Sequence, residues 1–329
     1  VLKASEHSPR TARWFVGQLG EHLPKDVIQL LDGAAEAGRA LIEADIDACT
    51  FTGSVGAGRE VARTCGEKLI PLSAELGGND AAIVLADCDM ERTLAGITHW
   101  ALHNAGQNCG AIERVYVESS IADTFVDRLA DAWSRLASDP DAAQHLCPLA
   151  NEPQLDVVED HVADALDRGA RLCAGGARTG AGFGYQPTLL DSCTPEMKVI
   201  RDETFGPVLA VTRVADPEEA LALANDSRYG LGGSVWTRDL ERGRALAQRM
   251  HCGVVNVNNH AVTGAMVNVP WSGTKDTGTG VANSAFALTT FVRPQTLLVD
   301  RSRKPDLFWL PFDSTLHQVG ERLARLQLG

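Results

Sequence analysis

The fold is constrained most by an alternation of short apolar runs, which predict strands, with amphipathic stretches that predict helices. In the first part of the chain, strands are predicted at residues 1–3, 27–31, 48–52 and 69–76, and helices at residues 9–20, 36–44 and 55–65. This alternation is typical of a parallel sheet with crossover helices. The sequence therefore predicts an α/β protein that opens with part of a Rossmann-like, cofactor-binding domain.

The alternation restarts after Gly77-Gly78, where we place the domain boundary. Further strands are predicted at residues 81–85, 114–118, 207–214 and 232–236, and helices at 90–104, 121–136, 154–168, 217–225 and 240–250. A loop is predicted at 138–148, a turn or hairpin at 175–184, a strand at 291–298 and a helix at 316–326. We predict a cofactor-binding part at 1–77, a second α/β domain at 78–280 and a C-terminal segment at 281–329.

Composition argues against several classes of protein. The formal net charge is -13 and no long basic run occurs, so nucleic acid is not an expected partner. No apolar run approaches the roughly 18 residues that a membrane helix needs, and no signal peptide is recognised. Neither the 8 cysteines nor the 9 histidines show metal-ligand or disulfide-framework spacing, so we expect no metal and a reducing, cytoplasmic location. Because the chain opens at Val1 inside a predicted strand, we expect that an N-terminal part of a longer protein precedes it.

A candidate nucleophilic cysteine lies in the stretch Asn104-Ala105-Gly106-Gln107-Asn108-Cys109-Gly110. Small neighbours leave room for a substrate carbon at the sulfur, and amide or backbone N–H groups can stabilise an oxyanion. A buried structural cysteine is the alternative, and the stretch alone does not decide between them.

Two further stretches suit a nucleotide. The turn Thr52-Gly53-Ser54 joins a strand to a helix start, where a pyrophosphate is favoured, although a tight connection explains it equally. Lys3 and Glu6 follow the first strand and can hold the hydroxyls of a ribose, although a solvated loop is the commoner meaning.

Two glutamates suit the same kind of site. Glu75 lies between Ala74 and Leu76, so its pKa should be raised toward the range of a general base; a strand-end carboxylate is the alternative. Glu203 precedes Phe205-Gly206-Pro207, a rigid apolar wall for a flat heterocycle with its ribose, or else a plain entry into a strand.

These stretches and a further one, Tyr229-Gly230-Leu231-Gly232, follow one another in the order of the motifs of the aldehyde dehydrogenase superfamily. The chain resembles that superfamily from about residue 1 to residue 291. The resemblance implies that Cys109 is the nucleophile and that Glu75 activates the water that hydrolyses the thioester. It implies cofactor contacts by Lys3, Ser5, Glu6, Gly53, Ser54, Leu76, Glu203 and Phe205. It also implies assembly as a dimer or tetramer, with residues 281–329 returning to the cofactor domain or an oligomer interface.

The implied reaction oxidises a small aldehyde to a carboxylic acid, with hydride transfer to NAD. Glu75 separates this chain from family members that pass the acyl group to coenzyme A. Glu6 favours NAD over NADP, because a carboxylate near the ribose would repel a 2′-phosphate. Candidates for the substrate pocket are His99, Trp100, His103, Asn258, His260 and Val262.

The chain departs from the family pattern at Ala4, at Asn79-Asp80-Ala81 and at Trp271-Ser272-Gly273. The family's oxyanion asparagine belongs to a segment before Lys3, which this sequence does not contain. Two other functions therefore stay open: a catalytically silent binding or assembly module, and an esterase or thioesterase that uses Cys109 and Glu75 without hydride transfer.

Overall fold

The computed structural model describes residues 1–138, 146–180, 182–304, 306, 309–310 and 314–327. The chain separates into two compact units, Val1–Phe291 and Val292–Gly329. The first contains the sheets, and the second carries helix α12 (Ser314–Gln327), which agrees with the helix predicted at 316–326. The loop predicted at 138–148 falls mostly on residues outside the described ones.

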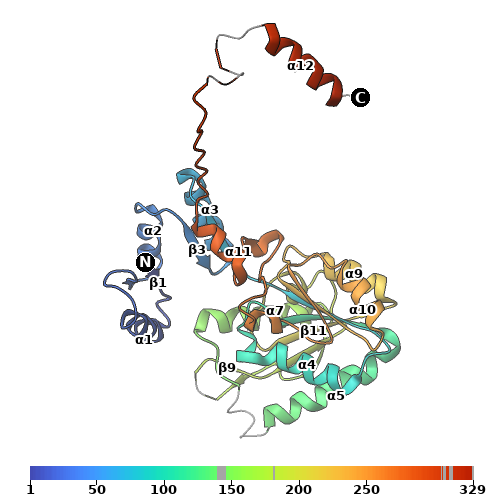
Figure 1. The fold of residues 1–329 in the computed structure, drawn as a ribbon. Coiled ribbons are helices and arrows are strands. Elements are labelled where there is room, and N and C mark those ends of the chain that lie inside the picture. Colours follow the sequence, from blue (N-terminus) through green and yellow to red (C-terminus); the bar gives the residue numbers. More distant parts are fainter. Residues whose placement is uncertain (139–145, 181, 305, 307–308, 311–313, 328–329) are drawn as a thin grey trace. The chain divides into compact units, whose positions relative to one another are not determined.

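A seven-stranded sheet forms the centre of the first unit (Figure 1). Its strands lie in the order β13-β12-β5-β6-β11-β10-β7. In that order they span Val254–Val257, Gly232–Trp236, Asp80–Val84, Ile112–Glu118, Val208–Val214, Thr188–Asp191 and Arg171–Ala174. All neighbouring pairs are parallel except β10 and β7, which are antiparallel.

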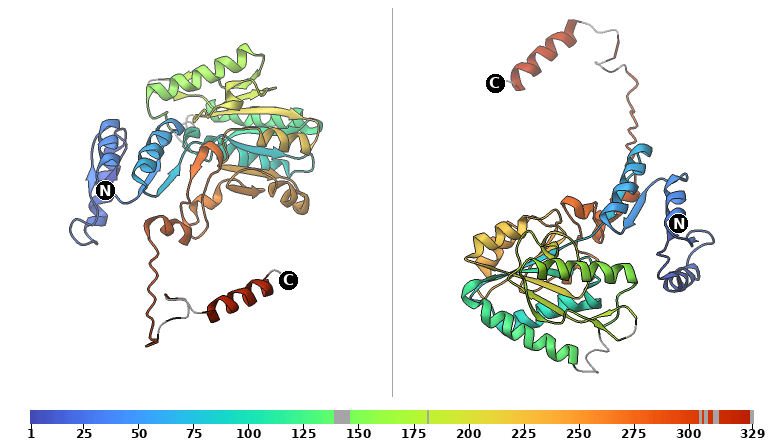
Figure 2. Two further views of the ribbon diagram at one scale, coloured as in Figure 1. Left: turned by 90° about the horizontal axis from the view of Figure 1, so that it is seen from above. Right: turned by 180° about the vertical axis from the view of Figure 1, so that it is seen from behind.

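Helices cover both faces of this sheet (Figure 2). On one face lie α4 (Met90–Leu102) and α5 (Ser119–Ser138), and on the other α7 (Glu152–Asp167), α9 (Pro217–Asn225) and α10 (Leu240–Ala247). The strands are apolar on both sides for this reason. In β5, Ala82 packs into the core beneath α4 and α5, whereas Ile83 packs into the core beneath α9 and α10.

The N-terminal elements form two smaller sheets. β1 (Leu2–Lys3) pairs in parallel with β2 (Leu30–Leu31), and β3 (Cys49–Thr52) pairs in parallel with β4 (Leu72–Glu75). β14 (Gly278–Thr279), from late in the chain, pairs antiparallel with β4. The helices of this part are α1 (Pro9–Gly20), α2 (Ala35–Glu43) and α3 (Val55–Lys68). Residues 76–79 lead directly from β4 into β5, so the end of one sheet adjoins the start of the other.

Side-chain caps explain why several helices begin where they do. Asp89, Asn151 and Asp239 each accept a hydrogen bond from a backbone N–H in the first turn of α4, α7 and α10. Asp216 accepts two such bonds at the start of α9, whose first residue is Pro217. Such residues satisfy N–H groups that have no partner within the helix.

Short elements complete the first unit. β8 (Arg178–Thr179) and β9 (Gly184–Tyr185) pair antiparallel, which confirms the hairpin predicted at 175–184. The others are α8 (Lys198–Arg201), α11 (Ser284–Leu288) and the 3₁₀ turns η1 (His103–Gly106), η2 (Val262–Ala265), η3 (Lys275–Thr277) and η4 (Thr289–Phe291).

The α/β fold with a parallel sheet is confirmed, and several element predictions are wrong. The helix predicted at 90–104 ends at Leu102, because Asn104 and Ala105 adopt left-handed backbone conformations. The strand predicted at 291–298 does not form: Leu297 and Leu298 are exposed and have no pairing strand among the described residues. Strands β7, β10 and β13 were not predicted. The proposed divisions after residues 77 and 280 stay predictions.

Within the described residues, no helix combines the length and the apolar character needed to cross a bilayer.

Gly96 provides a test of the packing between α4 and the sheet. A Cβ at Gly96 would lie 2.3 Å from Cη2 of the buried Trp236 ring. Gly96→Ala is therefore expected to lower the free energy of unfolding by about 1–3 kcal/mol, as overpacking does. Urea unfolding followed by tryptophan fluorescence measures it.

The control is Gly66→Ala in α3, where nothing lies within 4 Å of the added methyl. Alanine should stabilise that helix by about 0.5–1 kcal/mol. Equal stabilisation by both substitutions would contradict the packing described for Trp236.

Candidate active site

The turn that carries Cys109 lies between α4 and β6, at the N-terminal edge of the seven-stranded sheet. Its amide side chains hold the turn together. Asn104 Nδ2 donates to Gln107 O at 2.9 Å, and Gln107 Oε1 accepts from Ala150 N at 2.8 Å. Asn108 Oδ1 accepts from Gly110 N and lies 3.8 Å from Cys109 Sγ. The side-chain NH2 groups of Asn104 and Gln107 thus donate to backbone carbonyls and shape the turn.

Gly106 brings this turn against the loop of Glu203. Its φ is +71°, and a Cβ there would lie 2.0 Å from Gly206 O, so only glycine permits the contact. Glu203 in turn reaches the end of β4, where Oε1 accepts from Gly78 N at 3.0 Å. The structure therefore brings together the Glu75-Gly78, Gly106-Cys109 and Glu203-Phe205 stretches.

Glu113, on β6, organises the loop of Phe205 and was not identified from the sequence. Its two carboxyl oxygens accept from Thr204 N and Phe205 N, each at 2.8 Å. Complete burial raises the pKa of Glu113 well above its usual range. Phe205 has a φ of +49°, an uncommon conformation for a bulky residue, and these two bonds hold it there. The signal in the sequence was the charged pair Glu113-Arg114 at the start of a strand that is otherwise largely buried and apolar.

The electrostatic environment of Cys109 opposes its ionisation. Burial raises the pKa of the Cys109 thiol to about 11, and the negative charges of Asp80, Glu203 and Glu75 contribute to that rise. At neutral pH and without a ligand, the sulfur is therefore a thiol. A thiol is a much weaker nucleophile than a thiolate.

Glu75 has the raised pKa that its apolar neighbours predicted. Burial raises the pKa of Glu75 to about 7, and hydrogen bonding from the Ala282 backbone and the Trp271 side chain offsets part of the rise. Its Oε1 has no hydrogen-bond partner among the described residues. Burial likewise raises the pKa of Glu203 to about 7.

The predicted pyrophosphate turn adjoins Glu75. Gly53 N donates to Glu75 O at 3.2 Å, and Ser54 caps α3 by accepting from Ala57 N at 3.3 Å. Leu76 is buried against Gly58 of α3, where a Cβ would lie 2.4 Å from Leu76 Cδ2. Gly53, Ser54 and Leu76 are thus gathered at the strand end that carries Glu75.

Lys3, Ser5 and Glu6 form a local cluster after β1. Lys3 Nζ lies 3.3 Å from Glu6 Oε2, and Ser5 Oγ accepts from His7 N at 3.2 Å. A hydrogen bond from the backbone N–H of Glu6, followed by the contact with Lys3, lowers the pKa of the Glu6 carboxyl. No contact described in the structure joins this cluster to the turn of Cys109.

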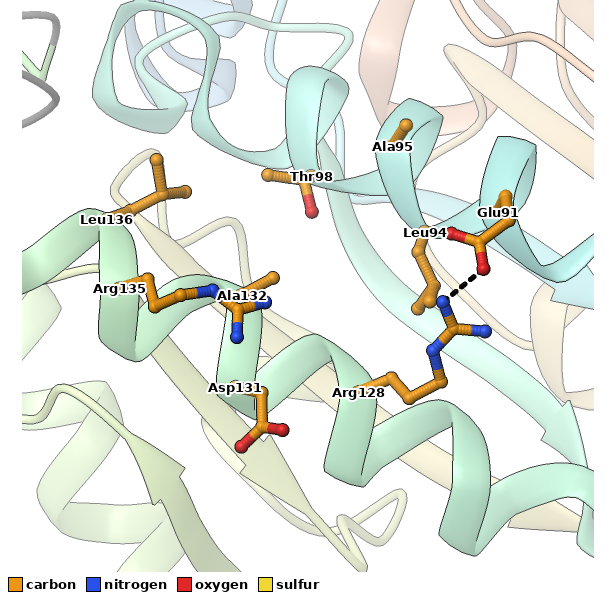
Figure 3. A pocket seen from close by; sticks show the side chains of 9 residues that line it. All are labelled: Glu91, Leu94, Ala95, Thr98, Arg128, Asp131, Ala132, Arg135 and Leu136. Atoms are coloured by element: carbon orange, nitrogen blue, oxygen red, sulfur yellow. Dashed lines mark hydrogen bonds and ion pairs between the residues drawn. The ribbon is translucent and has the colours of Figure 1, made fainter.

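A separate hollow of about 480 Å³ lies between α4 and α5 (Figure 3). Arg128 on α5 pairs with Glu91 on α4 at its rim. None of the predicted site residues lines it, so the hollow is distinct from the surroundings of Cys109. Across the described residues, no cluster of three or more His, Cys, Asp or Glu side chains is arranged to hold a metal.

Comparison with known proteins establishes the family. A family model described as "Aldehyde dehydrogenase family" matches residues 1–297. The chain belongs to the aldehyde dehydrogenase family.

Solved structures of this family share the fold. An aldehyde dehydrogenase from Mycobacterium tuberculosis, complexed with NAD+, has 35% sequence identity and a TM-score of 0.87, over 92% of this chain and 64% of that chain. PutA from Anabaena variabilis has 33% identity and a TM-score of 0.86, over 94% of this chain and 67% of that chain.

Curated relatives are longer than this chain. A Mycolicibacterium smegmatis protein named "Putative succinate-semialdehyde dehydrogenase (NADP(+))" is 36% identical over 85% of this chain and 55% of its own length. A 4,4'-diapolycopene aldehyde oxidase from Methylomonas sp is 35% identical over 89% of this chain and 55% of its own length. The chain thus spans about half the length of the curated relatives it matches.

Gly106→Ala tests the close contact between the Cys109 turn and the Glu203 loop. The substitution adds a methyl 2.0 Å from Gly206 O and places alanine at a positive φ. The backbone conformation alone costs about 1–2 kcal/mol, and the collision should increase that loss. Urea unfolding measures it.

Gly169→Ala is the matched control, because its φ is +95° and nothing lies within 4 Å of the added methyl. A loss for Gly106→Ala no larger than that of Gly169→Ala would show that the loops are not in close contact.

Proposed function

We propose that the protein oxidises an aldehyde to a carboxylic acid with hydride transfer to a nicotinamide cofactor. The observation that carries the proposal is that Glu75 is close enough to Cys109 for its charge to affect the thiol. Burial raises the pKa of this Glu75 carboxyl to about 7. Such a carboxyl is half ionised near neutral pH, which suits it to general-base work. Family membership supports the same reaction.

Cys109 acts in this proposal as the nucleophile. The Cys109 thiol loses its proton to solvent, the sulfur adds to the carbonyl carbon of the aldehyde, and the oxyanion that forms lies near the backbone N–H groups of the turn. After hydride leaves the carbon, a thioester on Cys109 remains. Glu75 then takes a proton from water, and the hydroxide attacks the thioester carbon. The C–S bond breaks, the carboxylic acid leaves, and the sulfur stays on Cys109.

The residues present fit a nicotinamide dinucleotide. We assign the adenosine ribose to Lys3 and Glu6 with Ser5 nearby, the pyrophosphate to Gly53 and Ser54 at the start of α3, and the nicotinamide end to Leu76, Glu203 and Phe205. The start of a 14-residue helix favours an anion. When bound, the nicotinamide supplies the hydride acceptor.

We propose NAD as the preferred cofactor, because a 2′-phosphate would stand close to the Glu6 carboxylate. The M. smegmatis relative carries NADP(+) in its name and the M. tuberculosis structure contains NAD+, so both cofactors belong in every assay. The small aldehyde substrate, assembly as a dimer or tetramer and the cytoplasmic location stay predictions.

Cys109→Ser tests the nucleophile in the intact protein. Serine is a far weaker nucleophile, so kcat/KM is expected to fall by about a thousandfold or more. Formation of NADH or NADPH with a panel of aldehydes measures it. Cys173→Ser, on β7 at the far edge of the sheet, is the control and should keep the wild-type rate. Equal rates in wild type and Cys109→Ser would remove Cys109 from the mechanism.

Glu75→Gln tests the base. Because the carboxylate is the active form, wild-type kcat is expected to fall about tenfold per pH unit below pH 7 and to level off above it. Glu75→Gln should lose steady turnover and keep one burst of NADH per site, since the thioester forms but is not hydrolysed. Stopped-flow absorbance between about pH 5.5 and 8.5 separates the two phases.

Glu67→Gln, on the exposed side of α3, is the control for this series and should keep the wild-type profile. A pH profile that is unchanged by Glu75→Gln would assign the base to another group.

A catalytically silent binding or assembly module is the second candidate, and the raised pKa of the Cys109 thiol is the observation that favours it. Titration of this 329-residue chain with NAD separates the two functions. Micromolar binding accompanied by turnover supports the enzyme, whereas binding without turnover supports the module. Ester cleavage faster than aldehyde oxidation would support the esterase hypothesis.

A further inference from the structure

We propose that Asp80 is a further residue of this site, whose buried negative charge keeps the Cys109 sulfur protonated at rest. The inference rests on the proposed role of Cys109 and assigns a positioning and electrostatic role to a residue outside the reacting groups.

Asp80 lies between a backbone donor and a buried imidazole. It is the first residue of β5 and is 1% exposed. Oδ1 accepts from Gly232 N at 2.8 Å, and Oδ2 lies 3.3 Å from Nε2 of His260, which is 0% exposed. A Cβ at Gly232 would lie 2.1 Å from Oδ2, so the carboxyl group fills its space.

Ser234 and Trp236 surround the other side of the His260 ring, at Nδ1. Trp236 Nε1 donates to Ser234 Oγ at 3.0 Å, and Ser234 Oγ lies 3.0 Å from His260 Nδ1. Since the indole can only donate, the serine hydroxyl is free to donate to Nδ1. The other ring nitrogen, Nε2, faces Asp80 Oδ2 at 3.3 Å, and neither of these two buried atoms has a hydrogen-bond partner in the described structure.

Asp80 adjoins the Cys109 turn. A Cβ at Gly78 would lie 2.3 Å from Cys109 O and 3.1 Å from Asp80 Oδ1, so both groups flank Gly78. Ala261, which follows His260, lies 3.4 Å from the position of a Cβ at Gly110. The Asp80–His260 pair therefore adjoins the backbone at Cys109 and Gly110.

Other charged groups near the pair do not neutralise it. Arg114 on β6 lines the same small cavity as Asp80, with Cys252, but its guanidinium donates to Asn79 O at 2.9 and 2.7 Å and to Tyr116 OH. Glu203 and Glu113 are further carboxyl groups of this region; burial raises the pKa of Glu203 to about 7 and that of Glu113 well above its usual range, and neither supplies a positive charge. Within the described part of the chain, His260 is the basic side chain found within 4.0 Å of Asp80.

A fixed negative charge close to a sulfur disfavours the thiolate. Burial comes first among the causes that raise the pKa of Cys109, and the charge of Asp80 comes second, ahead of Glu203 and Glu75. The resting cysteine is thereby protected from electrophiles and oxidants, which react with the thiolate.

The test measures alkylation of Cys109 by iodoacetamide as a function of pH, with the modified peptide identified by mass spectrometry and the fold checked by circular dichroism at each pH. Asp80→Asn keeps the shape and the acceptor for Gly232 N but removes the charge. The midpoint of the alkylation profile is expected to move down by about one pH unit, which gives about a tenfold higher rate at a fixed pH below both midpoints.

Asp87→Asn is the matched control. Asp87 lies beyond the other end of β5, where it accepts from Thr237 Oγ1, Arg238 N and Asp239 N. Asp87→Asn should lower the stability of the protein without moving the midpoint of the Cys109 alkylation profile. A midpoint unchanged in Asp80→Asn, or moved equally in Asp87→Asn, would overturn the proposal. A uniform change in rate with the midpoint fixed would show a merely structural role and overturn it as well.

The measurement does not depend on turnover. If Cys109→Ser keeps full activity, the proposed function fails while the alkylation profile still reports on Asp80.

Discussion

The site depends on the burial of carboxyl groups that are held mainly by backbone N–H donors. A buried carboxylate is costly unless hydrogen bonds compensate for the water it has lost. Glu113 binds Thr204 N and Phe205 N, Glu203 binds Gly78 N, and Asp80 binds Gly232 N. The bonds of Glu113 tie the Phe205 loop to β6, the bond of Glu203 ties the same loop to the connection between β4 and β5, and the bond of Asp80 ties β5 to β12, so the carboxyl groups fix the backbone around Cys109.

The same arrangement accounts for the reactivity of the two groups proposed for the chemistry. Glu75 has little compensation, since its Oε1 is without a hydrogen-bond partner in the described structure, and burial therefore raises its pKa into the useful range of a base. Cys109 is surrounded by several acids, and its pKa is raised away from the useful range. A positively charged group close to the sulfur would act in the opposite direction and lower the pKa of the Cys109 thiol.

The sequence was informative where the cause of structure is local. Helix α9 (Pro217–Asn225) has its predicted bounds because the Asp216 cap and Pro217 act within a few positions, and strand β12 (Gly232–Trp236) has its predicted bounds as well. The raised pKa of Glu75 was predictable from Ala74 and Leu76, although Trp271 and Ala282 lie far away in the sequence. The structure brings three of the family-motif stretches together, those of Glu75, Cys109 and Glu203, and the functional roles of their residues stay predictions.

What the sequence did not reveal depends on distant partners. Glu113 and the loop of Phe205 are 92 positions apart, and Asp80 and Gly232 are 152 apart, so no local pattern marks either contact. The apolar run at 291–298 had the composition of a strand, but a strand forms only where another one offers it a ladder of hydrogen bonds. Asn104 and Gln107 could be recognised as amides near a cysteine, whereas their use in holding a left-handed turn follows from the backbone at residues 104–106.

One short pairing has a consequence for how the protein is made. β14 joins β4 at Glu75 only through residues near 278, and Thr277 Oγ1 donates to Gly77 O across 200 positions of chain. Contacts this distant in sequence form late, because the intervening chain must first be ordered. During synthesis on the ribosome, Glu75 and Cys109 therefore both emerge before residues 271–282, and the surroundings of Glu75 are completed only when those residues follow.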